Sequence, residues 1–379
     1  MSAEIRMPLK SIFCLFIGLM LQGCDSPAPP CGNPVQITWL GVTTYAIQYE
    51  YEGETVRLLL DHQINGAYFD EVMANLEFDS VNYAFIGHNH FDHTGHCSEQ
   101  GDVLCEVSLA AYGEPEVPWI SAPFAELGQG RYGAHIVGPT GICANLADDE
   151  CTSLWAMDGV REMLLEEAGL RVLAFPSAHS QEFGELDYVR EHPEDNEPDP
   201  FTFIFEFPAA DKSCQSSLLW ANSTLTKSPY LDYTESLSRD GEEWSFDYRA
   251  LLQQAMSLRD NKPITYWAFW GDQLPESAWQ DWVDIVRPKT WSNHHHGIQS
   301  STYFPDLHTP FPGSPLGGPQ AEPRTEWIDI DTNAAVVFLP LRHYWDTVEL
   351  KDASASLNTP KQVELYTSFQ ERVTQLLGL

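Results

Sequence analysis

The sequence has 379 residues, of which 43% are hydrophobic and 12% aromatic, so the chain can bury a large core. Its 55 acidic residues outnumber 20 basic ones and give a formal net charge of −35. Because an acidic surface repels phosphate backbones, and no local basic patch is visible, this balance argues against a nucleic-acid partner. The length allows two or three domains, although α/β folds of this size often form one.

The N-terminal segment has the pattern of an export signal. A basic start precedes an apolar run at residues 11–21, which is too short to span a membrane as a mature helix. The run ends Leu21-Gln22-Gly23-Cys24, which resembles the bacterial lipobox, although an ordinary signal peptide with a chance cysteine is the alternative. We expect a lipoprotein signal peptide at 1–23, a Pro-rich tether at 24–34 and a single domain at 35–379. Lipid on Cys24 would hold the protein to the bacterial cell envelope on the periplasmic side.

The cysteine spacing agrees with export to an oxidising compartment. Of the 8 cysteines, Cys14 lies in the signal and Cys24 is the lipid site, which leaves six. Three disulfides are expected: Cys97 with Cys105, Cys143 with Cys151, and Cys31 with Cys214. Cys97 also lies close to a histidine-rich segment, so a metal-binding thiolate is the alternative role for that residue.

Apolar runs that end at Gly, Pro or polar residues predict strands along the whole chain. In chain order these are residues 35–41, 44–50, 56–61, 83–86, 134–138, 169–175, 202–207, 217–222, 264–271 and 336–341. Helical periodicity predicts helices at 68–76, 154–168, 248–258, 277–286 and 361–377. Residues 97–134, 185–199 and 298–325 have the composition of loops.

The strand at 83–86 is followed at once by His88-Asn89-His90-Phe91-Asp92-His93. Four of these six residues, His88, His90, Asp92 and His93, are of metal-ligand type. Imidazole and carboxylate together suit zinc, iron or manganese. A solvated polar loop is the alternative, but so many ligand types directly after a buried strand favour a metal site.

The pattern H-x-H-x-D-H after a hydrophobic strand resembles the signature of the metallo-β-lactamase-fold hydrolases. This resemblance implies an α/β fold, a four-layer αββα metallo-β-lactamase-like sandwich, with metals at one edge of its sheets. Asp61, which closes the strand at 56–61, matches the family's Asp that supports a metal-bound His; a turn-initiating Asp is the alternative.

Two later segments extend the resemblance. The turn Pro176-Ser177-Ala178-His179 places His179 as the next ligand, with a surface histidine as the alternative. His135 competes for that role but lies inside a strand pattern. The late Pro-Lys segment places His295 as the last ligand, with His294 as the alternative.

Asn222 is the largest departure from the family pattern. Many relatives carry there an Asp that bridges two metals, and neutral Asn cannot supply that charge. The second metal site should therefore bind more weakly, and the working site is either mononuclear or dinuclear.

The resemblance implies that His88, His90 and His179 hold the first ion. Asp92, His93 and His295 would hold a second, with Asp92 also orienting or deprotonating the attacking water. We expect zinc, with iron or manganese as alternatives.

The expected activity is hydrolysis of an ester, lactone or phosphodiester bond in a small-molecule or lipid-like substrate. A non-catalytic metal- or ligand-binding envelope lipoprotein is the main alternative, and an iron oxidoreductase is a third. The oligomeric state stays open.

Overall fold

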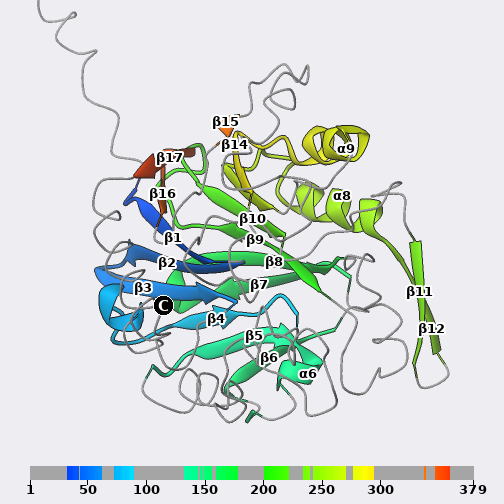
Figure 1. Ribbon diagram of the computed structural model, residues 1–379, viewed down its shortest axis with the longest axis horizontal. Helices are drawn as coiled ribbons and strands as arrows, with labels where there is room; N and C mark the ends of the chain where they lie inside the picture. Colours follow the sequence, from blue (N-terminus) through cyan, green and yellow to red (C-terminus); the bar gives the residue numbers. More distant parts are fainter. Residues whose placement is uncertain are drawn as a thin grey trace, which may run out of the picture.

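The computed structural model describes residues 32–41, 43–61, 72–88, 132–143, 146–147, 149–155, 159–177, 200–221, 234–239, 242–269, 276–293, 337–338 and 346–358. Most of these residues form two large mixed sheets that pack face to face (Figure 1).

The first sheet has 8 strands in the order β17-β16-β1-β2-β3-β4-β5-β6. Their bounds are β1 (Val35–Gly41), β2 (Thr44–Tyr51), β3 (Glu54–Leu60), β4 (Tyr83–Phe85), β5 (His135–Pro139), β6 (Cys151–Leu154), β16 (Thr347–Lys351) and β17 (Ser354–Asn358). Strands β3, β4, β5 and β6 run parallel, and the remaining neighbours are antiparallel.

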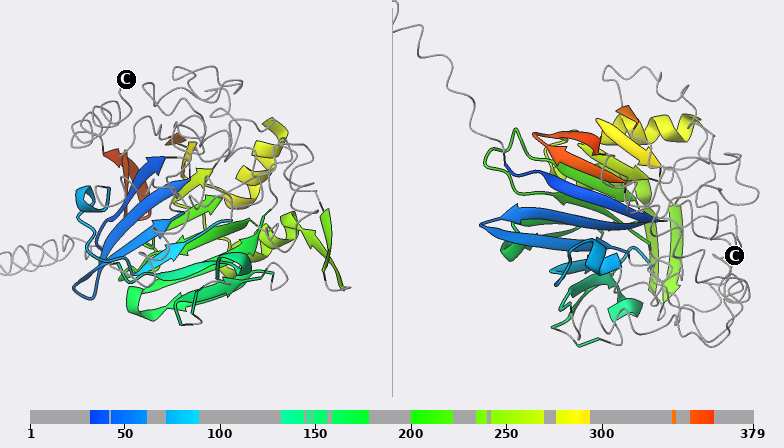
Figure 2. Two further views of the ribbon diagram at one scale, coloured as in Figure 1. Left: turned by 60° about the horizontal axis from the view of Figure 1, so that its bottom comes forward. Right: turned by 60° about the vertical axis from the view of Figure 1, so that its left-hand side comes forward.

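The second sheet has 7 strands in the order β15-β14-β13-β10-β9-β8-β7. Their bounds are β7 (Arg161–Leu165), β8 (Leu170–Pro176), β9 (Phe201–Glu206), β10 (Ser217–Ala221), β13 (Tyr266–Phe269), β14 (Thr290–Asn293) and β15 (Val337–Phe338). A separate hairpin, β11 (Thr234–Arg239) with β12 (Glu242–Asp247), extends beyond both sheets (Figure 2).

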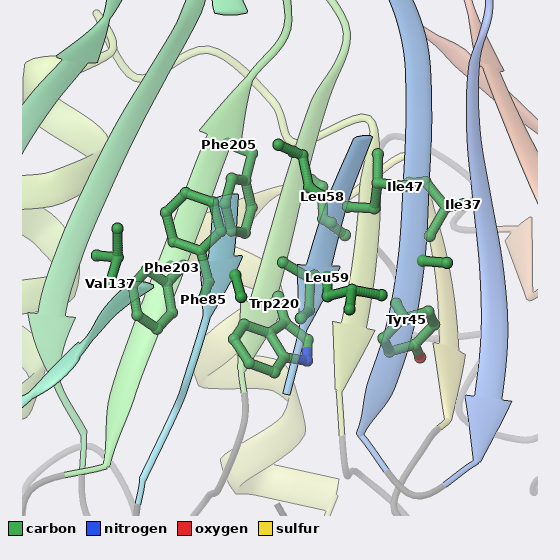
Figure 3. Packing of buried hydrophobic residues seen from close by; sticks show 14 of the residues in the cluster. Ile37, Tyr45, Ile47, Leu58, Leu59, Phe85, Val137, Phe203, Phe205 and Trp220 are labelled. Atoms are coloured by element: carbon green, nitrogen blue, oxygen red, sulfur yellow. The ribbon is translucent and has the colours of Figure 1, made fainter. Parts of the chain in front are cut away.

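Strand β9 shows how the sequence builds the layers, because its two faces belong to different cores. Phe203 and Phe205 point between the sheets, where both rings meet Phe85 of β4 edge-to-face at 5.7 and 4.9 Å (Figure 3). Ile204, one position away, lies in the second core on the outer face of the second sheet. Side chains alternate across a strand, so a strand buried on both faces appears in the sequence as an unbroken apolar run.

Helices α8 (Tyr248–Leu258) and α9 (Glu276–Val286) cover that outer face. Asp247 caps α8 by accepting the Ala250 N–H at 2.9 Å, and Leu252 is fully buried against the sheet. Helical residues 72–75 and α6 (Thr140–Cys143) lie beside the first sheet. The layers confirm the α/β αββα, metallo-β-lactamase-like sandwich. No helix within the described ranges is long and apolar enough to cross a membrane.

The helix predicted at residues 154–168 is wrong. Strands β6 and β7 and the short 3₁₀ helix η2 (Glu166–Ala168) occupy this stretch instead. Gly159 adopts φ +65° before β7, which then pairs with β8 as an edge strand and buries Met163 opposite Val172. Tertiary pairing here overrides the helix propensity of Glu, Met and Leu.

The disulfide predicted between Cys143 and Cys151 is confirmed and ties α6 to β6, with the two Cα atoms 5.6 Å apart. Cys214 is also disulfide-bonded. Cys31, Cys97 and Cys105 lie outside the described residues, so the other two predicted pairings stay predictions.

A buried ion network fastens the end of α8 to the second sheet. Glu206, only 4% exposed, accepts from Arg171 at 2.6 Å and from Arg259 at 2.9 Å. Arg171 also donates to the carbonyl of Leu258 at 2.9 Å, and Arg259 donates to that of Lys262 at 2.9 Å. Burial lowers the pKa of the Arg259 guanidinium, and the Glu206 carboxylate opposes that shift.

Glu206→Gln should lower the free energy of unfolding by roughly 2 kcal/mol, because Arg259 loses its only carboxylate partner among the described residues while it stays buried. Urea denaturation measures the change. Asp281→Asn is the matched control, since Asp281 pairs with Arg249 at 2.8 Å but is 43% exposed, and it should cost less than about 1 kcal/mol. Equal losses in the two variants would show that burial does not decide the strength of these pairs.

Candidate metal centre

Strands that precede the predicted ligands end at the same edge within each sheet. In the first sheet, β3 and β4 are parallel, so Asp61 and His88 follow neighbouring strand ends. In the second sheet, β8 and β10 are both antiparallel to β9, while β10, β13 and β14 run parallel. The carboxyl ends of β8, β10, β13 and β14 therefore share one edge.

Backbone hydrogen bonds join these two edges. The N–H of Phe201, the first residue of β9, donates to the carbonyl of Gly87 at 2.8 Å. The carbonyl of Pro200 accepts from the N–H of Ser177 at 2.7 Å and from its hydroxyl at 3.1 Å. The end of β4 therefore meets the end of β8, with the start of β9 between them.

His88 lies at this junction and is 3% exposed. Ile86 continues the β4 pairing by donating its N–H to Val137 at 2.8 Å. Gly138 allows the close approach, since a Cβ atom there would lie 3.2 Å from the Ile86 Cβ. Gly87 follows, and His88 is the first predicted ligand beyond the strand.

Asp61 holds the segment that carries His88. Its Oδ1 accepts the Gly87 N–H at 2.8 Å, its Oδ2 accepts the Thr43 hydroxyl at 2.5 Å, and its own N–H donates to Phe85 at 2.8 Å. The residue is fully buried and adopts φ +45°, in the left-handed region that Asp and Asn tolerate best after Gly. Asp61 therefore does more than begin a turn, because it fixes the backbone next to His88.

Most of the predicted site lies outside the described residues: His90, Asp92, His93, His179, Asn222, His294 and His295. Each of the later ones follows a described strand end closely. His179 comes two positions after Ser177, Asn222 one after Ala221, and His295 two after Asn293. The described strands that lead to these positions end at the same edge. Within the described ranges alone, no group of three or more His, Cys, Asp or Glu could hold a metal ion.

His135 is placed away from this edge. It begins β5, which is parallel to β4, so it lies at the opposite end of the sheet. Its Nε2 is 2.7 Å from the Thr152 hydroxyl, and its Nδ1 is 3.2 Å from the Asp149 carbonyl. These partners, with the ring of Tyr83 at 5.9 Å, give His135 a structural role.

Thr43 is a contributor that sequence reasoning missed. It is fully buried in the β1–β2 turn and donates to Asp61, which follows β3. The only local signal is its place directly before a strand, where Thr is common for other reasons.

Comparison with known proteins gives matches among solved structures alone. No protein-family model matches the sequence, and no curated protein matches it. A metallo hydrolase, Igni18, from the archaeon Ignicoccus hospitalis is 14% identical, with a TM-score of 0.44 over 83% of this chain and 98% of its own. A diphosphatase of the PhnP family is 10% identical, with a TM-score of 0.35 over 81% and 94%. MEM-A1, a subclass B3 metallo-β-lactamase from a soil metagenome, is 10% identical, with a TM-score of 0.31 over 63% and 77%.

Proposed function

We propose that this protein is a metal-dependent hydrolase that activates water at a histidine-rich site to cleave an ester, lactone or phosphodiester bond. One observation carries the proposal: the buried His88 follows β4 where the Gly87–Phe201 hydrogen bond joins the edges of the two sheets. The strands that lead to His179, Asn222 and His295 end at that same joined edge.

The residue types fit a transition metal. His88, with His90 and His179, would offer three imidazole nitrogens, which suit zinc best and iron or manganese as alternatives. Asp92, His93 and His295 would hold a second, weaker ion, because Asn222 lacks the charge of a bridging carboxylate. When bound, such a metal supplies Lewis acidity and brings the pKa of water toward neutrality.

The chain's own groups prepare this site. Asp61 holds Gly87, and through it the backbone of His88, by a hydrogen bond that is closed to solvent. Thr43 in turn fixes the Asp61 carboxylate. A preorganised ligand loses less conformational freedom on binding, so this support favours tight binding at the first ion. We assign Asp92 the role of orienting the attacking water and accepting its proton.

Turnover of a panel containing a generic phosphodiester, a lactone and a carboxylic ester tests the proposal. The purified protein should hydrolyse at least one of them, lose that activity on chelation and regain it when zinc is added. Bound metal without chelator-sensitive hydrolysis of any member would favour the alternative, a non-catalytic binding protein of the envelope. Iron bound in place of zinc, with redox turnover, would favour an oxidoreductase.

We also propose that lipid on Cys24 anchors the protein to the periplasmic side of the envelope, where it meets a small-molecule or lipid-like substrate. The support is the segment Leu21-Gln22-Gly23-Cys24 at the end of an apolar run. Cys24→Ala should move the protein from the membrane to the soluble fraction of a bacterial host and abolish incorporation of labelled fatty acid. Cys14→Ala, inside the predicted signal, is the control and should change neither. Labelling that persists in Cys24→Ala would contradict the anchor.

A further inference from the structure

The inner face of the second sheet carries a row of residues that differ strongly in size. Trp220 of β10 pairs with Ala268 of β13, which pairs with Ser292 of β14. All three are fully buried. The methyl group of Ala268 is much smaller than the indole beside it, so the row is shallow between Trp220 and Ser292.

Two polar side-chain atoms on this face of the sheet have no hydrogen-bond partner among the described residues. The indole Nε1 of Trp220 and the hydroxyl of Tyr266 are both buried, and neither is bonded to any group in the described part of the chain. A buried donor or acceptor without a partner is strongly destabilising, so such atoms are rare in folded proteins.

Trp220 and Tyr266 lie on the same face of the sheet as Ala268. Tyr266 precedes Ala268 by two positions and so faces the same side of the sheet. Its hydroxyl lies near those of Ser292 and Tyr45, although none of these approaches has the geometry of a hydrogen bond. The Trp220 nitrogen lies on the side of the indole turned away from Phe203, at the end of the core where Tyr45 also lies (Figure 3).

The geometry points to a binding site for a single water molecule above Ala268, between the two sheets. The water accepts the Trp220 N–H and donates to the Tyr266 hydroxyl, with the Ser292 hydroxyl as a third partner. Three polar neighbours are the usual number for an internal water in proteins. This site is independent of the proposed hydrolase activity, because it follows from unpaired atoms of the core alone.

Substitution that removes one partner tests the site. Tyr266→Phe should lower the melting temperature, because it takes away a hydroxyl that the water binds. Thr202→Val is the matched control, since the Thr202 hydroxyl is also buried and unpaired but sits in a row with Phe175 and Ala221, which offer a water no side-chain partner. That variant should leave the melting temperature unchanged or raise it. A melting temperature that rises in Tyr266→Phe as in Thr202→Val would overturn the water site.

A double-mutant cycle tests whether the two atoms share one ligand. Benzothienylalanine, introduced at position 220, keeps the shape of indole but has no N–H. The effect of Tyr266→Phe should shrink when position 220 is already changed, because the water has then lost its donor. Additive effects would overturn the shared ligand.

A high-resolution crystal structure of the unmodified protein gives a direct view and does not depend on whether a variant folds. An ordered water within about 3.2 Å of both the Trp220 nitrogen and the Tyr266 oxygen is the expected result. A dry contact at this point, or a direct hydrogen bond from either atom to another protein group, would overturn the proposal.

Discussion

His88→Ala is expected to reduce kcat/KM by more than roughly 100-fold on whichever ester, lactone or phosphodiester the protein hydrolyses. The imidazole is buried where the two sheets join, and alanine offers no metal ligand. The amount of metal bound per chain should fall together with kcat/KM, because only chains that still carry the ion are active. Steady-state kinetics and metal analysis of the same sample measure the two quantities together.

His135→Ala is the matched control for this experiment. Both histidines belong to the first sheet, but His135 begins β5 at the opposite end and is bonded to Thr152 and Asp149. Its loss should lower stability slightly and leave kcat/KM and metal content within about twofold of the unmodified protein. If His135→Ala removes the metal and His88→Ala does not, the site is assigned to the wrong edge of the sheet.

Asp61→Ala should have the second-largest effect, because it should lower both the free energy of unfolding and the metal affinity. It leaves the Gly87 N–H and the Thr43 hydroxyl buried without their acceptor, which should cost roughly 2–5 kcal/mol of unfolding free energy. The freed backbone at His88 should also lower the metal affinity about 10–100-fold. Urea denaturation and competition with a chromogenic chelator measure these changes.

Asp61→Asn tests whether the hydrogen bond to Gly87 carries both effects. Asn keeps an acceptor for Gly87 and tolerates φ +45°, so it should retain most of the stability that alanine loses. A loss of both stability and metal affinity in Asp61→Ala, with most of each retained in Asp61→Asn, is the expected outcome. Normal affinity in a folded Asp61→Ala would show that this carboxylate does not position His88.

Two hairpins illustrate which parts of the fold could be predicted from the sequence. Strands β2 and β3 are joined by Glu52-Gly53, both with positive φ, and the glycine marks the turn in the sequence. Strands β16 and β17 are joined by Asp352-Ala353, also both with positive φ, but no glycine marks that turn. The first pair was predicted, whereas the second, which completes one side of the first sheet beside β1, was not.

Strands buried on both faces were predicted well, because an unbroken apolar run such as that of β9 is compatible with few other structures. Edge strands such as β7 were not, since their pairing depends on partners elsewhere in the chain. The segment that contains β7 also has good helix formers, so its local propensity favoured a helix instead of the observed strand.

For the candidate site, too, some features could be predicted from the sequence and others could not. The ligand types and their places after apolar runs were visible in the sequence, and in the structure His88 follows β4. The support from Thr43 to Asp61, and the bond from Phe201 to Gly87, join residues that are far apart along the chain. No local pattern encodes such contacts, so only the folded chain reveals what holds His88 in place.

We propose that this sandwich holds a catalytic metal at the edge marked by His88, and metal analysis of the purified protein is the decisive experiment. We expect one or two equivalents of zinc, or of iron or manganese, in the unmodified protein, and clearly less than one in His88→Ala. A protein that retains no transition metal after expression in metal-replete medium and binds none in titration would contradict the claim, as would a His88→Ala variant with undiminished metal.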